Sequence, residues 1–175
     1  MAKLEIIKVP DPLLRGVSKP VESFDDRLGK LVADMLSTMY DAPGVGLAAV
    51  QVAVPRRLIV IDTAKPEEEP PRPMAIINPQ IVEIVGDEVR LHEEGCLSIP
   101  DVYAEIERPN SVRVVYQDAT GARREMLAEG LLATVVQHEI DHLNGKLFID
   151  YLSRLKRDRI VKKMIKAKRD AEASV

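Results

Sequence analysis

Aromatic residues are scarce in this sequence of 175 residues: they make up 3% of it, and tryptophan is absent. A buried core must therefore be built from Val, Ile, Leu, Ala and Met. The sequence contains one cysteine, Cys96, so an intramolecular disulfide is impossible and a secreted disulfide scaffold is excluded. A net charge of −3 gives no sign of binding to DNA or to a membrane surface.

Long apolar runs are also missing. No stretch approaches the roughly 18 apolar residues that a membrane span needs, so we expect no membrane span. The opening segment, MAKLEIIK, has no apolar core of signal-peptide length, because Glu5 interrupts the only candidate. Together with the lone thiol, these absences favour a reducing cytoplasm as the location.

The pattern of the chain predicts a single α+β domain spanning residues 1–175. Apolar residues at helical spacing predict helices over 28–40, 130–143 and 155–168, the first with a capping-box start at Ser23 and Asp26. Alternating or β-branched segments predict strands over 57–61, 74–85, 88–91, 102–107, 112–116 and 124–127. We expect antiparallel strands packed around the second helix, with one helix towards each end of the chain.

The segment HEIDH, residues 138–142, carries the most specific chemical pattern. Because residues four apart share one face of a helix, His138 and His142 can bind one metal ion. Glu139 can then approach a water on that ion without being a ligand. The surrounding stretch is strongly apolar, so burying two imidazoles and a carboxylate there would be costly without a function. The alternative interpretation is a helix with surface histidines.

A tetrahedral site with one position open for water needs a third protein ligand. Metzincin-type metalloproteases supply a histidine six residues after the second one, where this chain has Phe148. The remaining candidates are His92 and Cys96. Cys96 is the better ligand, because a thiolate binds Fe(II) or Zn(II) strongly, although a lone free cysteine is more often a small buried apolar residue. Two alternatives stay open: a zincin-like metallopeptidase, and a structural metal site closed by His92 as a fourth ligand.

Three segments together resemble the signature motifs of the peptide deformylases. They are GVGLAAVQ at 44–51, EGCLS at 94–98 and HEIDH at 138–142, which match the family patterns G-x-G-L-A-A-x-Q, E-G-C-L-S and H-E-x-D-H at every defined position. The helical C-terminal end resembles the type I branch, which is common in bacteria and organelles. The resemblance implies hydrolysis of the N-formyl group from newly made polypeptides that begin with formyl-methionine, with release of formate.

The resemblance also implies how the metal would be held and used. Cys96, His138 and His142 would bind one divalent metal ion. The resemblance favours Fe(II) in the cell, with Zn, Ni or Co as other occupants. Glu139 would act first as general base and then as general acid.

A further set of residues is implied for the substrate. The Gln51 side chain and the backbone N–H of Leu97 would face the developing oxyanion, and Gly46 would offer its backbone to the substrate chain. The methionine side chain needs an apolar pocket near the metal, and the candidates are Val45, Leu97, Val135 and His138, with His92 and Thr134 at its edge. Bacterial members often carry an arginine seven residues after the ligand cysteine. Tyr103 stands there, so Tyr103 and Arg108 are both candidates for contact with the substrate backbone.

Residues 154–169 contain nine basic residues and one acidic residue, Asp158. One interpretation is a solvated helix face over an apolar stripe. The other is docking to ribosomal RNA, which would place the enzyme where nascent chains emerge.

Overall fold

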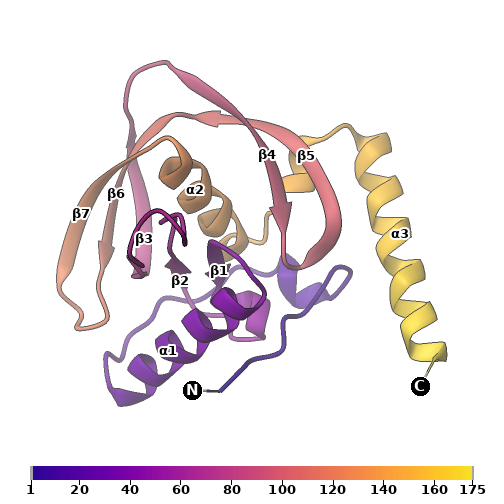
Figure 1. The fold of residues 1–175 in the computed structure, drawn as a ribbon, viewed down its shortest axis with the longest axis horizontal. Helices are drawn as coiled ribbons and strands as arrows, with labels where there is room; N and C mark the ends of the chain where they lie inside the picture. The colour runs from indigo at the N-terminus through magenta and orange to yellow at the C-terminus, as the bar shows by residue number, and fades with distance from the viewer. Residues whose placement is uncertain (1, 175) are drawn as a thin grey trace.

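The computed structural model describes residues 2–174 and has the predicted α+β architecture (Figure 1). In this part of the chain the α-helices are α1 (Asp26–Asp41), α2 (Leu131–Leu143) and α3 (Arg154–Ala173). Short 3₁₀ helices are η1 (Pro12–Arg15), η2 (Ala49–Val52) and η3 (Phe148–Tyr151). The strands are β1 (Gly46–Ala48), β2 (Leu58–Ile61), β3 (Met74–Ile84), β4 (Val89–Cys96), β5 (Ile99–Pro109), β6 (Ser111–Gln117) and β7 (Arg123–Glu129).

The strands form two antiparallel sheets. The larger sheet has the order β1-β2-β3-β6-β7, while β4 and β5 form a separate two-stranded sheet. The turn between the predicted strands 74–85 and 88–91 contains Gly86, with φ at +74°. It joins strands of different sheets, because β3 pairs with β2 and β6, whereas β4 pairs with β5. The turn therefore carries the chain from one sheet to the other.

Helix α2 occupies the centre of the molecule, within the curve of the strands (Figure 1). Ten of its thirteen residues are buried, which identifies it as a core helix rather than a surface one. Val136 and Ile140 pack with Ile59 and Val112 of the larger sheet. Full burial of such a side chain contributes about 1.5–3 kcal/mol. The core is built mainly of Val, Ile, Leu, Ala and Met, as the low aromatic content predicts.

Several predicted boundaries are wrong: α3 runs on from residue 168 to Ala173, and β5 exceeds the predicted strand 102–107 at both ends. Two further differences have a clear physical cause. Helix α1 is capped by Asp25, whose side chain accepts a hydrogen bond from the Leu28 backbone N at 3.1 Å, so the predicted cap at Ser23 is wrong. Asp25 has the extended backbone that an N-cap needs. Strand β4 continues past the predicted end at residue 91 to Cys96. Its pairing with β5 outweighs the poor strand propensity of a Glu-Glu-Gly sequence.

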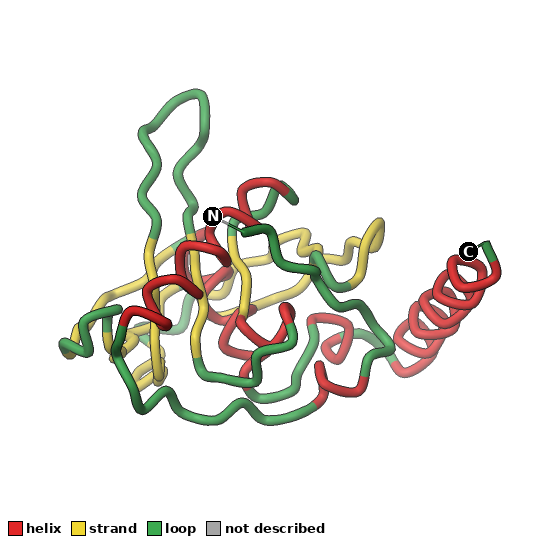
Figure 2. The backbone as a smooth tube through the Cα atoms, turned by 90° about the horizontal axis from the view of Figure 1, so that it is seen from below, coloured by secondary structure: helices red, strands yellow, loops and turns green. Residues whose placement is uncertain are grey.

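Helix α3 projects from the rest of the molecule (Figure 2). Met164 is its only fully buried residue, so most of its surface faces solvent. Among residues 2–174, no helix combines the length and the apolar character that crossing a membrane requires.

Candidate active site

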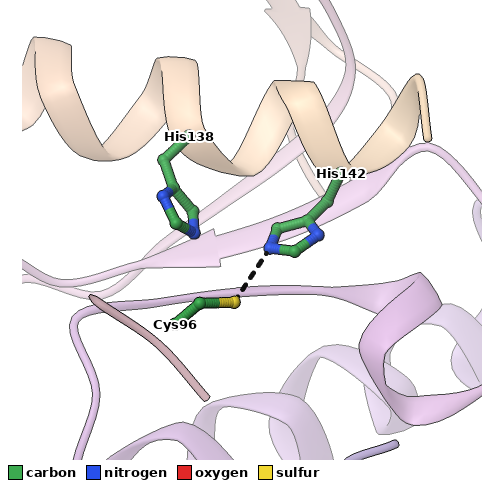
Figure 3. A group of neighbouring side chains, drawn as sticks. All are labelled: Cys96, His138 and His142. Atoms are coloured by element: carbon green, nitrogen blue, oxygen red, sulfur yellow. Dashed lines mark hydrogen bonds between the residues drawn. The ribbon is translucent and has the colours of Figure 1, made fainter. Parts of the chain in front are cut away.

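The predicted metal ligands Cys96, His138 and His142 lie together beside α2 (Figure 3). Cys96 ends β4, and the two histidines lie one turn apart on α2. The candidate ligand atoms all lie within 4.8 Å of one another, and Cys96 Sγ is 3.3 Å from His142 Nε2. In a tetrahedral site, bonds of about 2.3 Å to sulfur and 2.0 Å to nitrogen place these atoms roughly 3.5 Å apart. The spacing therefore fits a shared ion.

The chemistry of this donor set also fits a divalent metal. The Nδ1–H of His138 donates to Glu94 Oε1 at 2.8 Å, which leaves its Nε2 available as a ligand atom. Burial holds the pKa of His142 well below its usual value, whereas for His138 the effect of burial is outweighed by Cys96 and Glu94, which raise its pKa, so binding of a metal there would release a proton. Within residues 2–174 the group holds these three side chains and no fourth, and His92 lies outside it. A tetrahedral ion would keep one open position, as in catalytic sites.

Glu139 lies on the same helix, directly after His138. Its side chain is buried, and its Oε1 has no hydrogen-bond partner among the described residues. Burial raises the pKa of Glu139 to about 7. A carboxyl that titrates near neutrality can both accept and deliver a proton under physiological conditions.

Gly46 in β1 makes room for that carboxyl. A Cβ atom at Gly46 would lie 2.6 Å from Glu139 Oε2 and 2.9 Å from Val135 Cγ1, which is closer than such atoms can approach. Strand β1 pairs with β2, with Gly46 opposite Ile61, so its position is set by the larger sheet. The backbone of β1 and the Glu139 carboxyl are therefore held in direct contact.

Gln51 lies in η2 with its amide orientation set by three contacts. Its Oε1 accepts from the Ala48 backbone N at 2.9 Å, and its Nε2 donates to Ser98 Oγ at 3.0 Å. The same Nε2 lies 3.6 Å from Cys96 Sγ. One N–H of the Gln51 amide therefore points towards Cys96, the residue that precedes Leu97.

Cys96, His138, Glu139, Gly46 and Gln51 line one cavity of about 950 Å³, and His142 lies buried behind this lining. The predicted catalytic and substrate-binding residues that line it are Val45, Gly46, Gln51, His92, Leu97, Thr134, Val135 and Glu139. Val45 is exposed, while Thr134 is buried and its Oγ1 has no hydrogen-bond partner within residues 2–174. The structure thus brings together every predicted residue of this set.

Arg108 and Tyr103, the two candidates for contact with the substrate backbone, differ in accessibility. The Arg108 side chain is 3% exposed and donates twice to Glu94, at 2.6 and 3.0 Å, and once to Asp141, at 2.9 Å. It is therefore unavailable to a substrate. Tyr103 lines the cavity, is 66% exposed, and lies across Gly95, whose added Cβ would meet its ring at 2.6 Å.

The buried ion pairs of Arg108 were not foreseen from the sequence. Glu94 links Arg108 to His138, because it accepts hydrogen bonds from both. Burial alone would raise the pKa of Glu94, but His138 and Arg108 lower it below its usual value. Glu94 and Asp141 occupy defined positions of the motifs EGCLS and HEIDH. Their place in these motifs was the one sign in the sequence that both side chains make specific contacts.

The zincin-like alternative gains no support from this geometry. Phe148 stands where a metzincin would have its third histidine, and its ring stacks on His138 with centroids 6.0 Å apart. The third candidate ligand, Cys96, instead precedes the two histidines in the chain and lies on the two-stranded β4–β5 sheet.

A thiol and two imidazoles gathered around one point, with a buried carboxyl of near-neutral pKa at the same cavity, define the class of metal-dependent hydrolases. Residues 3–158 match the family model described as polypeptide deformylase. A peptide deformylase of Mesorhizobium japonicum is 61% identical over 166 residues, covering 94% of this chain and 93% of that protein.

Solved structures agree with the sequence comparison. The crystal structure of a peptide deformylase from Ehrlichia chaffeensis in complex with actinonin has a TM-score of 0.90 and 44% identity, covering 97% of this chain and 99% of that one. A Met-Ala-Ser-bound class I type b peptide deformylase from Acinetobacter baumannii has a TM-score of 0.80 and 35% identity, covering 86% and 99%. The chain belongs to the polypeptide deformylase family.

Proposed function

We propose that Cys96, His138 and His142 hold the metal ion with which this chain removes the formyl group from N-formyl-methionyl peptides. The family is metal-dependent, and the three side chains offer one sulfur and two nitrogen ligands within 4.8 Å of one another. A bound ion supplies Lewis acidity, which activates water and polarises the formyl carbonyl.

Glu139 moves the proton. It accepts a proton from the attacking water and delivers it to the nitrogen of the substrate as the C–N bond breaks, so formamide and water become formate and a free amine. Its burial supports this role, because a pKa of about 7 suits both transfers. Its contact with Gly46 keeps the carboxyl next to the strand that the substrate backbone follows.

Gln51 and Leu97 stabilise the oxyanion. The Gln51 amide is already oriented by Ala48 and Ser98, so its N–H needs no reorganisation when negative charge develops. The backbone N–H of Leu97 is the second donor. Loss of one such donor typically costs about 3 kcal/mol of transition-state stabilisation.

The methionine side chain enters the part of the cavity lined by Val45, Val135, Thr134 and His92. Beyond it, Tyr103 lies at the exposed rim and contacts the downstream part of the peptide, since the guanidinium of Arg108 is fully engaged elsewhere.

The observation that carries this proposal is the cluster of Cys96, His138 and His142, with Cys96, His138 and Glu139 lining one cavity. The test is release of formate from formyl-Met-Ala-Ser, compared with cleavage of casein by the same preparation. We expect formate release and no casein cleavage. Casein cleavage without formate release would contradict the proposal and favour a metallopeptidase.

For the metal, we propose Fe(II) in the cell, with Zn, Ni or Co as other occupants. Thiolate and imidazole ligands suit all four ions, so the choice depends on supply and oxidation state. Elemental analysis after anaerobic purification tests this, and iron should be the main metal. Zinc as the main metal under these conditions would contradict it.

For partners, we propose that the basic residues of α3 dock to ribosomal RNA in the cytoplasm. The helix is almost wholly exposed and nine of the residues in 154–169 are basic, which suits a phosphate backbone. Deletion of the residues after Ser153 should abolish salt-sensitive co-sedimentation with ribosomes. Unchanged co-sedimentation would remove this proposal while leaving the hydrolase assignment intact.

A further inference from the structure

Tyr151, at the end of η3, lies between two cationic side chains. Lys146 Nζ is 4.0 Å from the centroid of its ring, and Arg108 Cζ is 4.8 Å from it. The phenol O–H donates to Asp141 Oδ2 at 2.8 Å and accepts from Arg108 Nη1 at 3.3 Å. Tyr151 is 42% exposed, so these contacts hold a surface residue in one orientation.

From Tyr151 a continuous series of contacts leads inward to His138. Arg108 binds Asp141 and Tyr151 through Nη1, and it binds Glu94 through Nε and Nη2. Glu94 Oε1, which accepts from Nη2, also accepts from the Nδ1–H of His138. A guanidinium is planar and rigid. The contacts that orient Nη1 therefore also orient Nε and Nη2, which bind Glu94.

The same 3₁₀ helix touches His138 a second time. Phe148, the first residue of η3, stacks on the imidazole with an interplanar angle of 24°. The imidazole is thus held by Phe148 on its face and by the Glu94–Arg108 pair at Nδ1. Tyr151 reaches both supports: it lies in η3 with Phe148, and its O–H bonds Asp141 of α2 and Nη1 of Arg108.

We infer that Tyr151 is a positioning residue for the metal site, acting through Asp141, Arg108 and Glu94 on the orientation of His138. This inference rests on the proposed role of His138 as a metal ligand. Partners that orient a metal ligand commonly change metal affinity or activity about 10-fold to 100-fold when they are removed, and a residue one contact further out should have a smaller effect. The alternative is that Tyr151 merely anchors η3.

Tyr40 provides a matched control for the test. Its phenol donates to Asp62 Oδ2 at 2.6 Å, and it is 44% exposed, so Tyr40→Phe removes the same kind of bond from a similarly exposed ring. Neither Tyr40 nor Asp62 belongs to the series of contacts that ends at His138. A purely structural loss should therefore look alike in Tyr151→Phe and Tyr40→Phe.

The experiment compares the two variants and the wild-type enzyme in three measurements: zinc loss to a chelator, the absorption spectrum of the Co(II)-substituted protein, and kcat and KM on formyl-Met-Ala-Ser. Tyr151→Phe should lose zinc about 3-fold to 10-fold faster, alter the Co(II) spectrum and lower kcat with KM unchanged. Tyr40→Phe should match the wild type in zinc loss and spectrum. Equal behaviour of the two variants would overturn the inference.

Glu94→Gln, alone and combined with Tyr151→Phe, tests whether Tyr151 acts on His138 through Glu94. If Tyr151 acts through Glu94, adding Tyr151→Phe to Glu94→Gln should accelerate zinc loss no further. Fully additive effects would overturn the inference even if Tyr151→Phe alone is impaired. Failure of the proposed function would appear in the wild-type enzyme, which would then bind no metal or release no formate. Failure of the inference would appear only in the variants.

Discussion

Glu139 is an ionisable side chain, and neither oxygen of its carboxyl group is well solvated. One oxygen, Oε1, is buried without a partner among the described residues, and the other, Oε2, faces the backbone of Gly46. A side chain held at such a cost is expected to serve the reaction, since an amide of the same shape would be cheaper to bury.

We predict that Glu139→Gln keeps the metal and loses most turnover. The amide preserves the size of the side chain but cannot accept a proton, and general acid–base catalysis is typically worth about 10²-fold to 10⁴-fold. Formate release and elemental analysis measure the two effects separately. Glu93→Gln, at an exposed glutamate on the same cavity, is the control and should retain near wild-type rates. Turnover of Glu139→Gln within a few-fold of wild type would remove Glu139 from the mechanism.

The same carboxyl should make the metal-free protein sensitive to pH. Its pKa rises from 4.5 to about 7 on folding because burial disfavours the charged form. The folded state therefore prefers the protonated group, and its contribution to stability is complete below pH 4.5 and lost as the pH rises towards 7. Urea unfolding should show the wild type losing stability relative to Glu139→Gln across this window. A constant difference between the two proteins would contradict it.

At the level of elements, the site depends on how β1, β4 and α2 meet. Helix 130–143 was predictable to within one residue of α2, because its apolar pattern is a local signal. Strand β1 and η3 were not predicted, because each is only a few residues long and is held by tertiary contacts. The Glu94–Arg108 pair was equally hidden, since it forms only when β4 and β5 align.

Gly46→Ala tests the contact between β1 and α2. The new methyl group would press on Glu139 and Val135 at 2.6 and 2.9 Å, so the carboxyl must shift. A displacement of about 1 Å at a reacting group can cost roughly 100-fold in rate. We expect a loss of kcat of this order with metal content unchanged. Gly29→Ala in α1 is the control, because a Cβ there would meet no atom of the described residues within 4 Å. Equal kcat in the two variants would argue against this contact.

At the level of the whole molecule, the proposed ion would join two sheets. Cys96 belongs to the β4–β5 sheet, while His138 and His142 lie on the helix packed against the larger sheet. A ligand that binds only the folded state stabilises it by about 2.7 kcal/mol at 100 times its dissociation constant. The metal is therefore expected to act on the stability of the entire fold.

We predict that removing the metal with a chelator lowers the Tm and that restoring it raises the Tm again. Residues 1–175 should unfold in one cooperative transition in both states, as a single domain does. Cys96→Ser, which exchanges a thiolate for a hydroxyl, should respond much less to added metal. A wild-type Tm that is independent of metal would show that the ion does not bridge the two sheets.

X-ray absorption spectroscopy of the anaerobically purified, metal-loaded protein tests the central claim most directly. The predicted spectrum contains one sulfur at about 2.3 Å and nitrogen or oxygen neighbours at about 2.0–2.1 Å. Two of these neighbours should be the imidazoles of His138 and His142, and the rest should come from water. A spectrum without sulfur, or with a third imidazole from His92, would contradict the proposed site.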